Sequence, residues 1–374
     1  MRLVYKFSLA LFCLAISYAS LHAEGWGEYN KTVKKEFAIS SNGTVYLANK
    51  YGKVDVKTWD RNRVKLDILI SVRTSSESNA QRVFNRININ FSNTSNLVKA
   101  ITEIEPKKSN SIFGIWGNDK SDYTIDYEIY LPVSCQLELN NKYGDVYIDK
   151  MNAPISINIA HGSFKIDGSS DDVRVDVKHS NGTLGTGKNV YFSIKHSNLK
   201  LIRAEDVEFS SKHSNISIEK ANSIRCASKY DNYIIESARK IRNSGKYDNF
   251  EIGSVDEISI SAKYTNLRAL EVNQSIDFNM EHGGGTIRKL SRNFTDVQLD
   301  GRHSDFRIGL QSGTSFHLEA LGEYAGIRYP SDLITTYELE KGNKHEVKGY
   351  MGNSNTKKKI RAGLSYGGLR ITKD

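Results

Sequence analysis

The sequence has little of what organises many folds. It contains 3 cysteines and 4 prolines in 374 residues, and no apolar run beyond residue 23 approaches the ~18 residues of a membrane-spanning helix. Cys135 and Cys226 lie far apart, and a chain of this length can bury a core without disulfides. The scarcity of proline also argues against long disordered linkers. We expect no transmembrane segment in the mature chain.

Residues 1–23 have the pattern of an export signal. Arg2 and Lys6 precede the apolar run Phe7–Ile16, and small residues lead to a cleavage site after Ala23, with Ala19 as the rival. Its removal lowers the formal net charge from +9 to +7, because the segment carries two basic residues and no acidic one. The sequence therefore predicts an exported, mildly basic chain in the periplasm or at the cell surface.

The dominant signal is an internal repeat that recurs every ~17 residues between positions 178 and 266. Each copy has four successive positions. Lys comes first, His or Tyr second, a small polar residue or Asp third, and Asn fourth. A fixed period of this kind is typical of stacked structural repeats. The lysine column is Lys178, Lys195, Lys212, Lys229, Lys246 and Lys263. The ring column is His179, His196, His213, Tyr230, Tyr247 and Tyr264. The asparagine column is Asn181, Asn198, Asn215, Asn232, Asn249 and Asn266.

Apolar residues also recur at fixed distances from each ring, six and four residues before it and three and five after it. Phe192 and Phe209 illustrate the position four before the ring, and Leu201 and Ile218 the position five after it. Apolar residues at every second position predict strands with one buried face. We therefore expect an all-β chain, a single-stranded β-helix with rungs of ~17 residues, with these positions buried and the lysines exposed.

The domain organisation follows from where the repeat is regular. After the signal, residues 24–150 form an N-terminal β region or solenoid start, with an insertion at 73–121. Residues 151–374 form the β-helix repeats and a C-terminal cap. Within the insertion, Ser75–Ile87 is the one predicted helix, with Ala80, Val83, Phe84 and Ile87 on one face. Residues 106–121 are expected to be an exposed loop.

The repeat core also occurs in the N-terminal region, where Asn49–Val56 is nearly duplicated by Asn141–Ile148. Together with Trp59, Asp60 and Asp126–Pro132, these stretches resemble a bacterial putative-adhesin family catalogued as a domain of unknown function. The resemblance implies a β-helix in the cell envelope without catalytic residues to transfer. The regular succession of His and then Tyr departs from the family pattern.

Two of the columns have predicted structural roles. Asn tolerates left-handed backbone angles, so the asparagine column is expected at a sharp corner, with amides that bond along the stack. The ring column is expected to be a stacked ladder, facing inward or at a corner. Rungs ~4.8 Å apart would also bring His179, His196 and His213 close together, but Tyr follows in the same column, so we predict no metal site.

The lysine column is the candidate ligand-binding site. Its members fall opposite to the core positions, so they are expected to face water. One interpretation is a solvated face that resists aggregation. The other is a track for an anionic polysaccharide or lipopolysaccharide. Nucleic acid is not expected as a partner, because its recognition needs exposed aromatic faces between the charges. The sequence does not indicate an oligomeric state.

Signals for catalysis are few. Asp231 and Asp248 could form a carboxylate pair of the kind that polysaccharide-cleaving β-helices require, but their column otherwise holds Ser and Thr. Gly283–Gly285 opens no helix, and Cys226 occupies an apolar column. We predict a non-enzymatic adhesin-like or envelope binding scaffold without a cofactor. The alternative is a carbohydrate-active β-helix enzyme.

Overall fold

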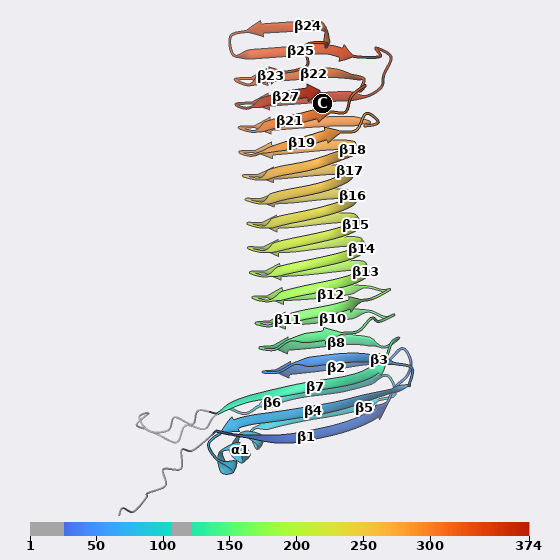
Figure 1. The fold of residues 1–374 in the computed structure, drawn as a ribbon, viewed down its shortest axis with the longest axis vertical. Coiled ribbons are helices and arrows are strands. Elements are labelled where there is room, and N and C mark those ends of the chain that lie inside the picture. The colour runs from blue at the N-terminus through green and yellow to red at the C-terminus, as the bar shows by residue number, and fades with distance from the viewer. Residues whose placement is uncertain (1–25, 107–120, 374) are drawn as a thin grey trace, which may run out of the picture.

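The computed structural model describes residues 26–106 and 121–373. The predicted signal peptide and nearly all of the predicted loop at 106–121 lie outside these residues. The described chain is a long stack of parallel rungs closed by antiparallel strands at each end (Figure 1). The predicted all-β solenoid is confirmed. Among the described residues, no helix is long and apolar enough to cross a membrane.

The middle of the stack has one long strand per rung, and each strand pairs in parallel with the next at the spacing of the sequence repeat. Val190 lies beside Val207, and Phe192 beside Phe209. Equivalent positions of successive repeats therefore lie directly above one another in the stack. The long strands are β13 (Asn181–Lys195), β14 (Asn198–Lys212), β15 (Asn215–Lys229), β16 (Asn232–Lys246), β17 (Asn249–Lys263) and β18 (Asn266–Glu281), and the shorter β12 (Val173–Lys178) precedes them.

The core consists of the apolar columns that the repeat predicts. Phe209, four residues before a ring, stacks on Phe192 with ring centroids 5.2 Å apart and is 1% exposed. The positions six before, three after and five after the rings are buried as well. Because a single rung has only one apolar face, neighbouring rungs supply the contacts that bury it.

The N-terminal end departs from sequence order. The rung formed by β2 (Thr44–Lys50) and β3 (Val54–Trp59) lies between two rungs made later in the chain. On one side are β6 (Leu97–Ile104) and β7 (Asp122–Pro132), and on the other are β8 (Gln136–Lys142) and β9 (Val146–Ile148). β10 (Ile155–Ala160) and β11 (Ser163–Gly168) continue the stack towards its middle.

Antiparallel strands cover this end. β1 (Gly27–Ala38) pairs with β4 (Arg63–Thr74), which pairs with β7, while β5 (Ile87–Thr94) pairs with β6. The predicted helix exists but is shorter, because α1 spans Glu77–Phe84 with Ser76 as its N-cap. Ala80, Val83 and Phe84 are buried on one face, whereas Ile87 is the first residue of β5.

The C-terminal end repeats the same device. The last two strands, β26 (Lys359–Ser365) and β27 (Gly368–Lys373), form a rung between two earlier ones. On one side are β20 (Asp296–Arg302) and β21 (Asp305–Leu310), which follow β19 (Gly284–Leu290). On the other are β22 (Phe316–Glu323) and β23 (Gly326–Arg328). β24 (Ile334–Lys341) and β25 (Lys344–Met351) pair antiparallel with each other, and β25 pairs with β22, to close the stack.

Candidate functional site

One edge of the stack is a corner formed by the ring column. Successive rings lie face to face, with centroids 4.7–5.1 Å apart and interplanar angles of 2–14°. The ladder extends well beyond the six strict repeats. In spatial order it contains Tyr51, Tyr143, His161, His179, His196, His213, Tyr230, Tyr247, Tyr264, His282, His303, Tyr366 and Tyr324.

These rings also make the turn. In the described part of the chain, the non-glycine residues with positive φ are the thirteen members of the ladder, with φ between 50 and 62°. The prediction that Asn takes the left-handed position is therefore wrong, since the turn residue is two positions earlier. A left-handed residue with a side chain costs about 1–2 kcal/mol, and each stacked pair contributes about 0.5–1.5 kcal/mol. Stacking therefore offsets the backbone strain that an aromatic corner introduces.

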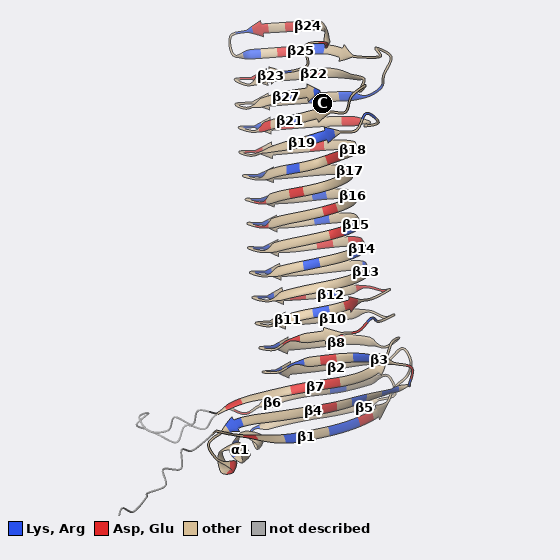
Figure 2. Cartoon of the chain, in the orientation of Figure 1, with Lys and Arg blue, Asp and Glu red and all other residues tan. Residues whose placement is uncertain are grey.

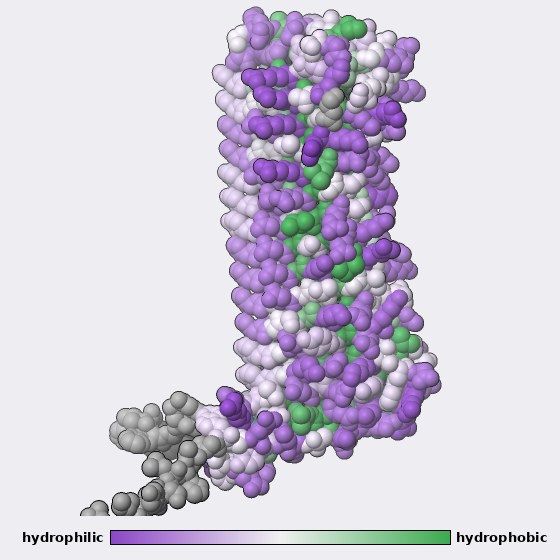
Figure 3. Space-filling model, in the orientation of Figure 1, coloured by the Kyte–Doolittle hydropathy of each residue, from purple (hydrophilic) through white to green (hydrophobic). Residues whose placement is uncertain are grey.

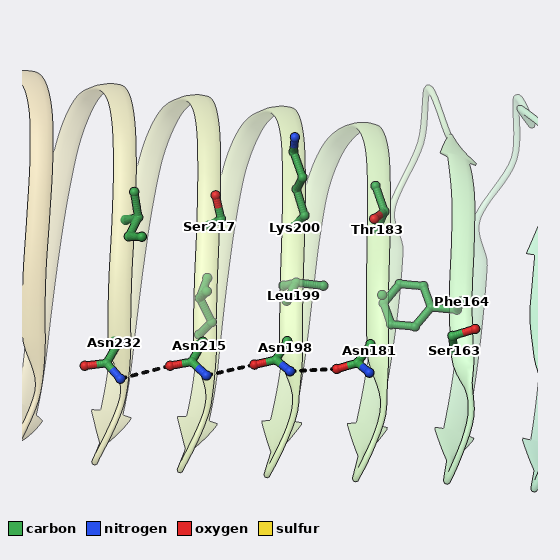
Figure 4. A pocket seen from close by; sticks show the side chains of 13 residues that line it. Ser163, Phe164, Asn181, Thr183, Asn198, Leu199, Lys200, Asn215, Ser217 and Asn232 are labelled. Carbon is green, nitrogen blue, oxygen red and sulfur yellow. Dashed lines mark hydrogen bonds between the residues drawn. The ribbon is translucent and has the colours of Figure 1, made fainter.

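The asparagines begin the strand after each corner, and the amides of the first four, Asn181, Asn198, Asn215 and Asn232, bond along the stack. The Nδ2 of Asn198 donates to Oδ1 of Asn181 at 2.7 Å. Asn215 donates in the same way to Asn198, and Asn232 to Asn215 (Figure 4). This ladder fixes the polar wall of a shallow hollow of about 650 Å³ on the adjoining face.

In the six strict repeats, the residue after the ring is buried beneath the corner. It is a serine after His179, His196 and His213, whereas Asp231 and Asp248 take this place after Tyr230 and Tyr247, where they are 1% and 2% exposed. Ser211 donates to Asp231 and Ser228 to Asp248, each at 2.8 Å. Burial raises the pKa of Asp231, and it raises the pKa of Asp248 to about 6. Both carboxylates are structural acceptors beneath the corner rather than groups in a surface groove.

The size of the residue two positions before each ring explains which rungs can hold a buried aspartate beneath the corner. Ile194 fills this position in a His rung, but Ser211, Ser228 and Gly245 occupy it around the two aspartates. A Cβ on Gly245 would lie 2.2 Å from Oδ2 of Asp248. The small residues therefore make room for the buried carboxylates. Nearby, Cys226 is buried in the apolar column as predicted, and burial raises the pKa of its thiol.

The lysine column runs along the same edge, immediately before the rings. Its six members are exposed and in register on six consecutive rungs, β12 to β17 (Figure 2). Lys178 lies 3.8 Å from Asp176, and Lys263 pairs with Glu281. No acidic side chain in the described chain lies within 4 Å of the ammonium groups of the four lysines between them, Lys195, Lys212, Lys229 and Lys246.

Of the two positions predicted for the rings, inward or at a corner, the structure shows the corner. Tyr230, Tyr247 and Tyr264 are 42–46% exposed. Their faces are nevertheless covered by the neighbouring rings, and only their edges meet solvent. From Tyr143 to Tyr366, each ring of the ladder is stacked on both faces, which leaves no free aromatic face there for a nucleic acid base or a sugar ring. What the edge offers a ligand is ammonium groups, ring edges and amides.

The histidine segment of the ladder is a poor metal site. Centroids of neighbouring imidazoles lie 5.0 Å apart in nearly parallel planes, as for His179 and His196. Two nitrogens that share one Zn²⁺ must lie within roughly 4 Å of each other, since each Zn–N bond is about 2.0–2.1 Å. The residues that the structure describes contain no group of three or more potential metal ligands. Burial, and then the neighbouring His179 and His213, lower the pKa of His196.

The face after the corner carries features that the repeat did not reveal. Hydrophobic residues form a broken strip along the stack (Figure 3), and Ile234 and Leu270 are exposed on the strands that follow the corner. Towards the C-terminal end, Arg307, Arg370 and Arg328 align on adjacent rungs. They escape sequence analysis because their alignment depends on the insertion of β27 between β21 and β23.

A β-solenoid with polar columns along one edge defines the structural class of this protein. No family model matches the sequence, and a search of curated proteins finds no relative. The chain matches several solved structures at low identity, among them the following three. One is described as a putative cell adhesion protein from Clostridium sporogenes, with 11% identity, a TM-score of 0.19, and coverage of 92% of this chain and 100% of that one.

The second, a putative adhesin from Bacteroides fragilis, has 11% identity and a TM-score of 0.22, and the match covers 91% of this chain and 97% of that one. The third is described as a putative lipid binding protein from Parabacteroides distasonis. It has 12% identity and a TM-score of 0.23, with coverage of 91% and 96%. Identities of 11–12% and TM-scores of 0.19–0.23 carry no argument about the function of this chain.

Proposed function

We propose that this protein is an exported, non-enzymatic, adhesin-like binding scaffold of the cell envelope, and that its lysine column binds an anionic polysaccharide or lipopolysaccharide. The observation that carries the proposal is the alignment of six exposed lysines on consecutive rungs, four of them without an acidic partner among the described residues. The export signal predicted for residues 1–23 supports the location.

The physical reason is the repulsion within the column. Two ammonium groups ~4.8 Å apart repel by about 0.9 kcal/mol in bulk water before screening. Side-chain splay and salt reduce this repulsion, but a linear polyanion laid along the column removes it and gains an attraction at each rung. Five intervals of ~4.8 Å give the column a length of about 24 Å, which suits an extended polymer rather than a small molecule.

The test changes Lys195, Lys212, Lys229 and Lys246 together to Gln. Folding should be retained, because each side chain is exposed and repulsion is relieved. Binding to heparin and to lipopolysaccharide should weaken sharply at low salt, and the salt dependence of the remaining affinity should flatten. A matched control changes Arg203, Lys220, Arg225 and Arg242 to Gln, which removes the same charge outside the column. Equal retention of both variants by the ligands would reject the lysine column as the binding site.

A further inference from the structure

A second cationic column lies on the other side of the corner, nearer the C-terminal end. It occupies the fourth position after the ring, where side chains point outward. Its members, in spatial order, are Arg268, Thr286, Arg307, Arg370 and Arg328. The last three are exposed arginines on three adjacent rungs, which we call the arginine triad.

The arginine triad owes its existence to the inserted C-terminal rung. Arg370 of β27 is in register with Arg307 of β21 on one side and with Arg328 of β23 on the other. Like charges directly opposite each other on neighbouring strands are destabilising. In the described chain, no carboxylate lies within 4 Å of these three guanidinium groups. The triad is therefore a concentration of positive charge without an ion-pair partner among the described residues.

The surface in front of the triad is hollowed. Arg307, Arg328 and Arg370 line a hollow of about 260 Å³ whose floor includes Gly326, Gly367 and Gly368. On the rungs of Arg370 and Arg328, Gly368 and Gly326 stand where the middle of the stack carries the asparagine ladder, and Asp305 stands there on the rung of Arg307. A Cβ on Gly326 would meet no atom within 4 Å, so the space beside the arginines is open. A neighbouring hollow of about 440 Å³ joins Arg307 to Arg268.

We infer that the arginine triad is a binding site for a phosphate or sulfate ester. A guanidinium presents a planar fork of N–H donors that matches two oxygens of an oxyanion. A carboxylate has two oxygens and satisfies one such fork, whereas a monoester of phosphate or sulfate has three terminal oxygens for three forks. The inference does not depend on the lysine column, because the triad lies on different rungs and on the other side of the corner.

Asp305 is the acidic neighbour of the site. It lines both hollows, and its Oδ1 lies 3.1 Å from the position that a Cβ on Gly368 would take. An exposed carboxylate at this border repels an incoming oxyanion. Replacing Asp305 with Asn removes the repulsion and keeps a hydrogen-bonding side chain of the same shape. The affinity of the site for oxyanions should therefore rise several-fold in Asp305→Asn.

The experiment measures binding by the full chain with three probes in isothermal titration calorimetry. The probes are inorganic phosphate, dextran sulfate, and carboxymethyl dextran of matched charge density. The site variant changes Arg307, Arg328 and Arg370 to Gln. The charge-matched control changes Arg203, Arg225 and Arg242 to Gln, and circular dichroism checks that each variant is folded. A single Arg370→Lys variant keeps the charge and removes one fork.

We expect the site variant to lose at least about tenfold in affinity for dextran sulfate, because charge-assisted hydrogen bonds are lost. The control should keep its affinity, and Arg370→Lys should lose several-fold. The affinity of the site variant for carboxymethyl dextran should fall less than its affinity for dextran sulfate. Binding of inorganic phosphate that depends on the triad identifies a site for a free oxyanion, whereas triad-dependent binding of dextran sulfate alone requires the ester on a polymer.

Equal losses in the site variant and the control would overturn the inference, as would an unchanged affinity in the site variant. Should the triple variant fail to fold, Arg370→Lys and Asp305→Asn decide the question, since they are expected to change the affinity in opposite directions. In the quadruple lysine variant, the part of the affinity for dextran sulfate that depends on the triad should be unchanged. This result separates the triad from the proposed function of the lysine column.

Discussion

The middle of the stack and its two ends are built from the same rung by different rules. Between His179 and Tyr264, each rung pairs with the rungs one repeat before and one repeat after it in the chain. At the N-terminal end, β2 pairs with the distant β8, so that Thr44 lies beside Gln136. At the C-terminal end, β26 and β27 return to fill a gap between rungs that precede them in the chain.

This difference teaches what closes a solenoid. A middle rung is stabilised by neighbours that are close in sequence, so its contacts are nearly one-dimensional. A free end would expose unpaired N–H and C=O groups of an edge strand, which invite aggregation. Here each end is covered by antiparallel strands, and the outermost parallel rungs are tied together by a segment inserted between them. Length comes from the middle, and closure from long-range pairing.

Removing the inserted C-terminal rung should cause the largest difference in stability between the ends and the middle of the stack. Ending the chain after residue 357 deletes β26 and β27, and with them the buried side chains of Ile360, Leu364, Leu369 and Ile371. At about 1.5–3 kcal/mol each, their loss amounts to about 6–12 kcal/mol.

Hydrogen exchange should then show protection lost over residues 296–351 and retained over residues 179–264, because middle rungs depend on their own neighbours. A control chain that ends at Thr372 should resemble the full-length protein. Uniform loss of protection over the whole stack would contradict the separation of ends and middle.

A smaller effect is expected from a cavity in the middle. Phe209→Ala should lower the free energy of unfolding by about 3–5 kcal/mol, as measured by chemical denaturation, since Phe209 is buried against Phe192 and Tyr233. The loss should spread to the adjacent rungs. Tyr191→Ala, which removes an outward-facing ring from the neighbouring rung, serves as control and should cost little. A change within about 0.5 kcal/mol for Phe209→Ala would remove this residue from the core.

The smallest effect concerns the corner, where strain and stacking oppose each other. Tyr247→Ala should cost about 1–3 kcal/mol, because two stacked contacts are lost and a side chain stays in the left-handed position. Tyr247→Gly should cost about 1 kcal/mol less, because glycine adopts this conformation without strain. Tyr247→His keeps a stackable ring and should be nearly neutral. Equal stability of the Ala and Gly variants would show that the corner is not strained.

The sequence predicts the middle of the molecule well because its contacts repeat. The apolar columns, the exposed lysines and the axial bonds of the asparagines all follow from the period of the repeat and the alternation of strands. The corner is the exception within this region. Propensity favours Asn or Gly at a left-handed residue, and nothing in a single repeat shows that thirteen rings stabilise one another in that conformation.

The ends are harder to predict, because pairing there is not periodic. The helical pattern of the sequence reaches Ile87, but that residue enters β5, whose pairing with β6 outweighs the pattern. The arginine triad combines residues 307, 328 and 370 in a spatial order that differs from their sequence order. A period found along the chain cannot place a segment that folds back between two rungs already made.

The inserted rungs also set an order of events in time. Thr44–Trp59 is among the first parts of the chain to be synthesised, yet one of its two neighbours ends at Ile148. Until that segment exists, one side of β2 and β3 stays open as an unpaired edge. At the other end, the gap between β21 and β23 is filled only after β27, which follows both in the chain, has been made. A growing chain therefore carries an open β-edge at β2 and β3 until Ile148 has been made, and a second one between β21 and β23 until β27 has been made. Such edges are where a growing β-protein is most exposed to mispairing.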